Sequence, residues 1–309
     1  MHDVIIVGGS YAGIAAALQL ARARRDVLVL DAGERRNRFA HASHGFLGQD
    51  GEDPATIAAR GREEVRAYPT VTWLDTQVHE ARSVLGGFFV VRTGSGDHHA
   101  KRLILATGVA DELPPIPGLA EQWGRHAFTC PYCDGYELNL GRVGVLITGP
   151  TSIHHAELVA EWGAPGKTVA FLNGQPEPHA GERAALQRRR IALERNPVAS
   201  VAHSPEGIEV RLRNGDQLKL AALFLATRTR LVTPFAEQLG CALEEGPMGP
   251  FYKTSMMKET SVPGVFACGD AALPMANVSF AVADGVRAGV TAHASLVFTA
   301  DAGHGGSEE

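Results

Sequence analysis

The chain opens on a short buried strand that runs directly into a glycine-rich turn and a helix. Residues Asp3–Val7 form a continuous apolar run rich in β-branched side chains, which is typical of a strand covered on both faces. The alanine- and leucine-rich segment Ala12–Arg24 predicts a helix, and Val27–Leu30 predicts the next buried strand. This order is a β-α-β unit, which constrains the chain to an α/β fold with helices covering a parallel sheet.

The turn carries the residues of a dinucleotide-binding site. A pyrophosphate needs backbone N–H groups at a helix N-terminus, glycines for close approach, and an acidic residue after the second strand for a ribose hydroxyl. These positions are held by Gly8, Gly9, Ser10, Gly13 and Asp31. Ser10 replaces the usual middle glycine, and Gly9 beside it eases the same approach. The alternative is a tight turn without a ligand. The acid at the second strand favours FAD or NAD over NADP.

A second β-α-β pattern occupies the middle of the chain. It starts at Val143, continues through a helix near Ile153–Trp162 and reaches another strand at Thr168–Leu172. The proline-rich segment Leu113–Gly118 is the best linker between the two regions. We therefore predict a discontinuous first domain from residues 1–115 and 245–300, an inserted second domain from residues 116–244, and a disordered tail at residues 301–309.

Three other segments have clear secondary-structure patterns. Val71–Arg92 alternates like antiparallel strands around a Gly-Gly turn, and Leu218–Ala226 resembles one strand. A long helix is expected from about Asn277 to Phe298.

Composition excludes several classes of protein. Lys and Arg total 29 against 34 Asp and Glu, giving a formal charge of −5, so we expect no nucleic-acid partner. The longest apolar runs fall short of a membrane span, and no basic leader precedes the first strand. We therefore expect a cytoplasmic protein without a membrane partner.

Two of the four cysteines form one C-x-x-C motif, Cys130 and Cys133. The motif lacks the second pair that a structural zinc site needs, so we expect no metal. In a reducing compartment, a C-x-x-C that forms a disulfide is usually catalytic. The alternative is a pair of buried structural cysteines. Cys241 and Cys268 have no such partner and are expected to be small buried apolar residues.

The motifs together resemble low-molecular-weight thioredoxin reductases over essentially the whole chain. Ala106-Thr107-Gly108 resembles a second flavoprotein signature, and the segment ending in Gly269-Asp270 resembles a third. The motif C-P-Y-C-D-G lies between them, in the order of that family. The resemblance implies two Rossmann-like domains, a homodimer, and FAD as cofactor, with Thr107, Gly108, Gly269 and Asp270 in its site and Asp270 at the ribityl chain.

The same resemblance assigns roles around the cysteines. Cys133 would be the sulfur nearest the flavin, and Cys130 would exchange with substrate. Asp134 matches the acid of the family and would handle a thiol or flavin proton.

The second β-α-β unit departs from a reductase, which must bind NADPH there. Ile147 stands where the first glycine belongs, and a β-branched side chain should hinder the tight turn. Asn173 and its neighbours follow the next strand where arginines should bind the 2′-phosphate. The run Arg188–Arg190 is expected to be a solvated helix face, with contact to a phosphate as the alternative. These departures argue against NADP(H) binding.

Without NADPH, the simplest electron donor is a dithiol, which reverses the flow of electrons. The combination resembles the FAD-dependent dithiol oxidases of natural-product pathways, which close the disulfides of gliotoxin, holomycin and romidepsin-type molecules. The resemblance implies a small-molecule dithiol as substrate and molecular oxygen as acceptor, giving hydrogen peroxide. A divergent NADPH-dependent thioredoxin reductase and a flavin-bound thiol sensor are the alternatives.

A base near the redox pair would help to form substrate thiolates. His41 and His44 lie in a loop that runs near the flavin in related proteins, and His44 is the candidate we carry forward. The alternative is a pair of structural loop histidines. His154 and His155, in the second domain, are both expected at the surface.

Overall fold

The computed structural model describes residues 1–149 and 152–298 and divides into two compact units. The first contains residues 1–38, 54–110 and the chain from 229 onward, and the second contains residues 39–53 and 111–228. The chain therefore crosses between units near residues 110 and 228, whereas the sequence suggested 115 and 244. The loop 39–53 belongs to the second unit, where Phe39 lies against Gly124. The predicted tail, residues 301–309, lies outside the described residues.

The first unit is built on a seven-stranded sheet with the order β3-β2-β1-β6-β5-β4. Strand β19 pairs with the second half of β6, parallel to it. β3, β2, β1 and β6 are also parallel, whereas β4, β5 and β6 form an antiparallel layer. The strands are β1 (His2–Val7), β2 (Val27–Asp31), β3 (Val71–Asp75), β4 (Val78–Val84), β5 (Phe88–Thr93), β6 (Gly96–Leu105) and β19 (Val265–Ala267).

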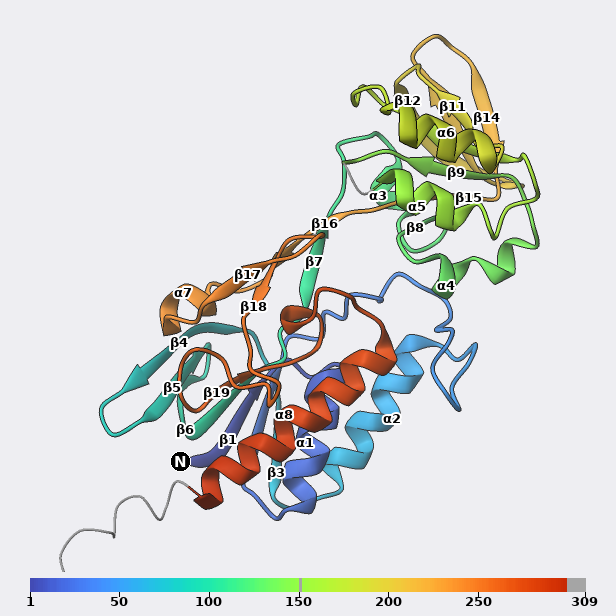
Figure 1. The fold of residues 1–309 in the computed structure, drawn as a ribbon. Helices are drawn as coiled ribbons and strands as arrows, with labels where there is room; N and C mark the ends of the chain where they lie inside the picture. The colour runs from blue at the N-terminus through green and yellow to red at the C-terminus, as the bar shows by residue number, and fades with distance from the viewer. Residues whose placement is uncertain (150–151, 299–309) are drawn as a thin grey trace, which may run out of the picture. The chain divides into compact units, whose positions relative to one another are not determined.

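Three helices lie side by side along this sheet, α1, α2 and α8 (Figure 1). Glycines on α8 let it approach α1 closely, because a Cβ at Gly285 or Gly289 would overlap the backbone of Ala12 or Ala16. The helices of this unit are α1 (Tyr11–Arg22), α2 (Pro54–Arg66), α7 (Phe235–Leu239), α8 (Val278–Phe298) and the 3₁₀ helix Gly269–Ala272. A small antiparallel pair, β17 (Leu243–Glu245) and β18 (Pro250–Tyr252), completes it.

The second unit repeats this plan. Its five-stranded sheet, in the order β11-β10-β9-β15-β8, is parallel throughout, and β12, β13 and β14 form an antiparallel layer. The strands are β8 (Ala127–Phe128), β9 (Val143–Leu146), β10 (Thr168–Phe171), β11 (Ala192–Glu194), β12 (Val198–Ser204), β13 (Gly207–Leu212), β14 (Gln217–Leu220) and β15 (Ala222–Leu225). The helices are α3 (Leu119–Gln122), α4 (Pro131–Asp134), α5 (Ser152–Val159), α6 (Ala180–Arg188) and the 3₁₀ helix Tyr136–Leu138.

Two paired strands, β7 (Val109–Glu112) and β16 (Arg228–Leu231), carry the chain out of the first unit and back. The predicted α/β class with two Rossmann-like repeats is confirmed. Two strand predictions were wrong in detail. Val71–Asp75 is the outer strand of the parallel sheet, paired with β2, and Leu218–Ala226 is divided between β14 and β15, which lie in different sheets.

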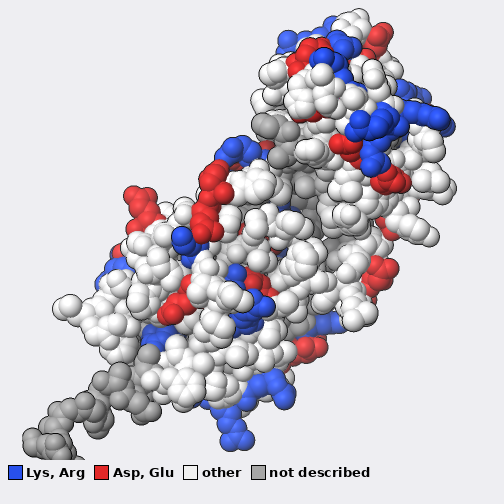
Figure 2. Space-filling model, in the orientation of Figure 1, with Lys and Arg blue, Asp and Glu red and all other residues white. Residues whose placement is uncertain are grey.

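The surface carries both signs of charge. Figure 2 shows Lys and Arg mixed with Asp and Glu on the face drawn. Among the described helices, none combines the length and the apolar character that a bilayer span requires.

Candidate functional site

The first glycine turn, between β1 and α1, has no space for side chains. Gly8 has a φ of +104°, and a Cβ there would overlap the carbonyl oxygen of Ala106. A Cβ at Gly13 would overlap the carbonyl oxygen of Gly8, and one at Gly9 would strike the Trp73 ring, 2.6 Å from its Cη2. Gly8 and Gly13 are thus required by close backbone approach, and Gly9 by the side chain of Trp73.

Asp31, at the end of β2, faces this turn. Its Oδ1 accepts hydrogen bonds from the backbone N–H groups of Gly9, at 3.1 Å, and Gly33, at 3.2 Å. Ser10 is the N-cap of α1, and in the described part of the chain its side chain makes no capping bond. The helix therefore presents its N-terminus without a hydroxyl cap, as an anion site requires.

The second and third flavoprotein signatures, Ala106-Thr107-Gly108 and the segment ending in Gly269-Asp270, also lie in the first unit. The Thr107 hydroxyl is buried and has no hydrogen-bond partner among the described residues. Gly108 has a φ of +67° and open space where a Cβ would stand. Gly269 has a φ of +70°, and its Cβ would come 2.9 Å from that of Ala12. These three residues border β6 and β19, at the carboxyl ends of neighbouring parallel strands.

Charged side chains that were not predicted from the sequence bind the two residues of the third signature, Gly269 and Asp270. Arg36 donates to Asp270 Oδ2 at 2.9 Å. Behind it, Gly269 N–H donates to Asp284 Oδ2 at 2.9 Å, and Lys258 Nζ lies 3.1 Å from Asp284 Oδ1. Lys258 and Asp284 are both buried, so each compensates the charge of the other. The signal in the sequence was Asp284, a lone acidic residue within the otherwise mostly apolar sequence of α8, which indicates a buried polar contact.

Cys130 and Cys133 form a disulfide in the second unit. Cys130 is the N-cap of α4, and Pro131 takes the first helical position, where a missing N–H costs nothing. The backbone N–H groups of Cys133 and Asp134 both donate to the Cys130 carbonyl oxygen at 3.2 Å. Both cysteines are half-buried.

Asp134 and His44 lie close to the disulfide segment. Burial raises the pKa of Asp134 from its ordinary value of 3.8 to about 7, and the charge of Glu137 adds to this rise while His44 opposes it. His44 Nε2 is 3.4 Å from Glu137 Oε1, and its Nδ1 is 3.5 Å from Asp50 Oδ1. His41 is exposed, and its charge contributes to lowering the pKa of His126, not that of Asp134. The structure thus places His44 beside Glu137 and within electrostatic reach of Asp134.

The second glycine turn, between β9 and α5, is closed by the hydroxyl of Ser152. Ser152 Oγ accepts from the backbone N–H groups of Thr148, at 3.0 Å, and Gly149, at 3.2 Å. Thr148 Oγ1 donates to the Ala226 carbonyl oxygen at 2.6 Å. Ile147 is buried in the core beside β9, and its N–H donates to the Phe171 carbonyl oxygen at 2.9 Å. Two N–H groups of this turn are therefore already used within the protein.

The positions expected to bind a 2′-phosphate have structural partners. Asn173 Oδ1 accepts from the backbone N–H of Val198 at 3.0 Å. The run Arg188–Arg190 is exposed, and Arg189 pairs with Glu157 at 3.5 Å and also with Glu161.

The surface prediction for His155 was wrong. His154 is exposed, with its Nδ1 3.5 Å from Glu157, whereas the His155 ring turns inward and its Nε2 lies 2.9 Å from the Thr129 carbonyl oxygen. The difference arises because neighbouring helix residues point about 100° apart. Cys241 and Cys268 are buried as expected, and burial raises the pKa of both thiols.

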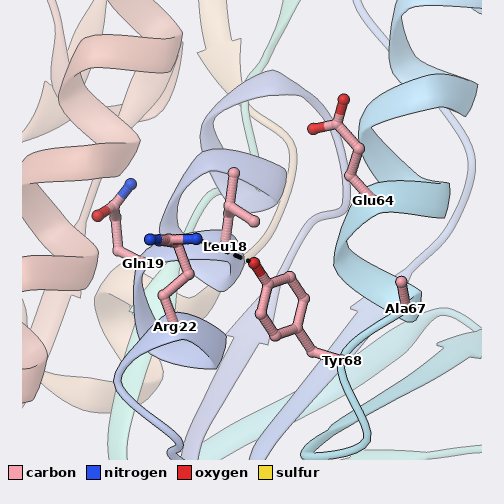
Figure 3. A pocket seen from close by; sticks show the side chains of 6 residues that line it. All are labelled: Leu18, Gln19, Arg22, Glu64, Ala67 and Tyr68. Carbon is pink, nitrogen blue, oxygen red and sulfur yellow. Dashed lines mark hydrogen bonds between the residues drawn. The ribbon is translucent and has the colours of Figure 1, made fainter.

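A separate hollow of about 660 Å³ lies between α1 and α2 (Figure 3). Arg22 crosses it and donates to the Tyr68 hydroxyl at 3.3 Å. The hollow contains none of the predicted site residues, so we assign it no role.

Two Rossmann-like units, one with a glycine cradle and one with a C-x-x-C disulfide, define a disulfide oxidoreductase. The chain belongs to the pyridine nucleotide-disulphide oxidoreductase family, whose model matches residues 2–287. It is similar to thioredoxin reductase sirT of Leptosphaeria maculans, with 31% identity covering 94% of this chain and 92% of the relative. The resemblance to thioredoxin reductases predicted from the motifs is confirmed.

Solved structures agree with this family. An oxidoreductase from Agrobacterium tumefaciens is 48% identical, with a TM-score of 0.91 over 96% of this chain and 99% of that chain. The structure of HlmI is 32% identical, with a TM-score of 0.90 over 98% of this chain and 94% of that chain.

Proposed function

We propose that the protein oxidises a small-molecule dithiol to a disulfide, using FAD and the Cys130–Cys133 pair. The first unit would hold the flavin and the second carries the disulfide. The small-molecule substrate is inferred from the resemblance to dithiol oxidases, and the homodimeric state from the resemblance to thioredoxin reductases.

Three features of the first unit support a fit to FAD. The glycine turn admits close approach of a pyrophosphate to the start of α1, where an anion is stabilised. Asp31 stands where a ribose hydroxyl would bind, and its Oδ2 is the oxygen left for that bond. The buried Thr107 hydroxyl has no partner in the described chain, and a bound group would supply one. FAD held there would accept two electrons from the thiol pair and transfer them to oxygen, giving hydrogen peroxide.

The turn between β9 and α5, in which Ser152 engages two backbone N–H groups, is the observation that favours an oxidase over a reductase. A pyridine nucleotide would need N–H donors that Ser152 Oγ already engages, and a tight turn that the buried Ile147 does not provide. Arg189, which directly follows α6, pairs with Glu157 of α5 and with Glu161 in the turn after it. Electrons are therefore proposed to enter from a dithiol.

The dithiol reaction consists of two exchange steps. A first substrate thiolate attacks Cys130 Sγ, which forms a mixed disulfide and releases Cys133 as a thiolate. The second substrate thiolate then attacks the substrate sulfur of that mixed disulfide, which closes the product disulfide and releases the Cys130 thiolate. Two electrons pass from substrate to the cysteine pair.

His44 and Asp134 are proposed to move the protons of these steps. His44 would take the proton of a substrate thiol at a ring nitrogen, because a thiol attacks only as its thiolate. Asp134 follows Cys133 directly in the chain, and its raised pKa lets the carboxyl exchange a proton with that thiol near neutral pH.

Oxygen uptake tests this function. With flavin-loaded protein in air, dithiothreitol should give sustained oxygen consumption, and added catalase should return part of that oxygen by decomposing peroxide. The variant Cys130→Ser should show no such uptake. Sustained reduction of a disulfide by NADPH would contradict the proposal and favour the reductase that the names of the relatives suggest. Flavin reduction by dithiothreitol without repeated turnover in air would favour a thiol sensor.

A further inference from the structure

The peptide that precedes Cys130 is held from two sides within the second unit. Thr129 lies between β8 and α4. Its hydroxyl donates to the Leu225 carbonyl oxygen at 3.1 Å, which ties it to the end of β15. Its carbonyl oxygen, 2.9 Å from His155 Nε2, is tied to α5. Thr129 is therefore tied to two different elements, and the bond from His155 is the one made to the peptide between Thr129 and Cys130.

The hydrogen bond between His155 and the Thr129 carbonyl oxygen defines the tautomer of the His155 ring. A carbonyl oxygen only accepts, so Nε2 carries the proton and donates it. Nδ1 is buried and has no partner among the described residues, so a proton there would have no acceptor. The ring stands edge-on to Phe224, with centroids 6.4 Å apart. Burial lowers the pKa of His155, although the bond to Thr129 acts in the opposite direction, and this shift favours the neutral ring.

A second residue from the same part of the chain contacts the motif farther along. Trp162 lies just beyond α5, and its ring packs edge-on to that of Tyr132, with centroids 5.0 Å apart. A Cβ at Gly135 would come 2.6 Å from Trp162 Cγ. The segment His155–Trp162 therefore contacts both the residue before the C-P-Y-C-D-G motif and the motif itself, and His155 provides a side-chain hydrogen bond to the residue directly before Cys130.

We propose that His155 is a positioning residue of the redox pair, holding the Thr129–Cys130 peptide so that the Cys130–Cys133 disulfide is favoured over the dithiol. A disulfide closes more readily when the backbone already holds its two sulfurs close together, because less chain freedom is lost. The inference rests on the proposed role of these cysteines as the redox pair.

The test is the equilibrium of the protein with glutathione under anaerobic conditions. Two glutathione thiols give one glutathione disulfide, while the Cys130–Cys133 bond takes up two electrons and two protons. Thiols are trapped by alkylation at equilibrium and counted by mass, which reports on the cysteines whatever the state of the flavin.

Three variants separate the hydrogen bond from general structure. In His155→Phe the ring shape is kept but the donor is lost, and the equilibrium should shift about tenfold toward the dithiol, equal to about 30 mV for a two-electron couple. In His155→Gln an N–H donor is retained, and most of the wild-type equilibrium should return. His154→Phe, at the exposed neighbour, should match wild type. Thermal melting and flavin content verify that each variant is folded.

An equilibrium within about twofold of wild type in His155→Phe would overturn the inference, and so would an equal shift in His154→Phe. The oxygen-uptake assay is independent. If dithiothreitol drives no oxygen uptake and the His155→Phe equilibrium still shifts, the oxidase proposal fails and the positioning role stands.

Discussion

At the scale of single residues, Asp134 carries a carboxyl that ionises near neutral pH. Burial disfavours its charged form, and the nearby carboxylate of Glu137 disfavours it further. His44 acts in the opposite direction, and it also lies within 3.4 Å of Glu137. With a pKa of about 7, Asp134 is a base above neutral pH and an acid below it, which suits a group that exchanges protons with a neighbouring thiol.

This assignment predicts the pH dependence of flavin reduction by a dithiol. The Cys133 thiolate released by exchange equilibrates with its thiol, and only ionised Asp134 can return that thiol to the thiolate, so the rate should rise as pH increases through about 7. Asp134→Asn cannot ionise, and we expect a rate about 10²-fold lower without that inflection. Stopped-flow absorbance across a pH series measures both. Asp216→Asn, in an exposed turn, is the matched control. An unchanged inflection in Asp134→Asn would assign the titration to another group.

The first glycine turn gives a residue-scale prediction for the cofactor. Gly13→Ala places a methyl group against the Gly8 carbonyl oxygen, and forced overpacking of this kind costs about 1–3 kcal/mol. Flavin affinity should fall about tenfold or more, as measured by flavin retained per chain on dialysis. Gly94→Ala, which meets open space, should retain wild-type flavin. Equal flavin content in both variants would argue against this turn as the site.

Residues that act through local sequence were predictable, whereas those that act across the fold were not. The glycines of the first turn and the C-x-x-C are readable because their chemistry depends on short spacing. Arg36 and Asp270 are 234 residues apart in sequence, and no local pattern pairs them. His155 was misassigned because the sequence does not show which face of α5 carries the Thr129 contact.

At the scale of elements, the two strand-to-helix turns differ in what occupies their N–H groups. In the described chain α1 begins without a side-chain cap, and its turn is lined by glycines. At α5, Ser152 Oγ engages two backbone N–H groups of the turn. The first turn uses the N–H of Gly9 on Asp31 but, in the described chain, leaves the start of α1 without a side-chain cap. In the second turn, Ser152 engages the N–H groups of Thr148 and Gly149.

Removing the Ser152 hydroxyl tests this difference. Ser152→Ala leaves the N–H groups of Thr148 and Gly149 without that acceptor, and the free energy of unfolding should fall by about 1 kcal/mol. Chemical denaturation measures the loss, and exposed Ser83→Ala should show almost none. Because Ile147 remains in the core, we expect no gain of NADPH-driven flavin reduction. A gain would show that the hydroxyl alone closes the site.

Most element types were predictable from periodicity, but their partners were not. The helices α1 and α8 and the strands β1, β2 and β9 match their sequence patterns to within two residues. The apolar run Leu218–Ala226 gave no sign of its division at Ala221, where the backbone leaves one sheet and its N–H donates to the Arg142 carbonyl oxygen. Strand pairing depends on distant segments, which an isolated pattern does not contain.

At the scale of the whole molecule, the chain contains two units with the same architecture. Each unit combines a parallel sheet with a three-stranded antiparallel layer, and the family to which the chain belongs spans both units. The two units differ in their turns, because one keeps a glycine-lined turn, whereas the other carries the disulfide and has a turn in which Ser152 engages the N–H groups of Thr148 and Gly149. We propose that the second unit is retained for its redox pair and not for a nucleotide.

Anaerobic reduction of the flavin tests this central claim most directly. Oxidised, flavin-loaded protein is mixed with dithiothreitol or with NADPH, and the visible absorbance of the flavin is followed. We expect bleaching by dithiothreitol, almost none by NADPH, no dithiol bleaching in Cys133→Ser, and return of colour with peroxide when air is admitted. Rapid bleaching by NADPH would contradict the proposal, whether or not dithiothreitol also bleaches the flavin.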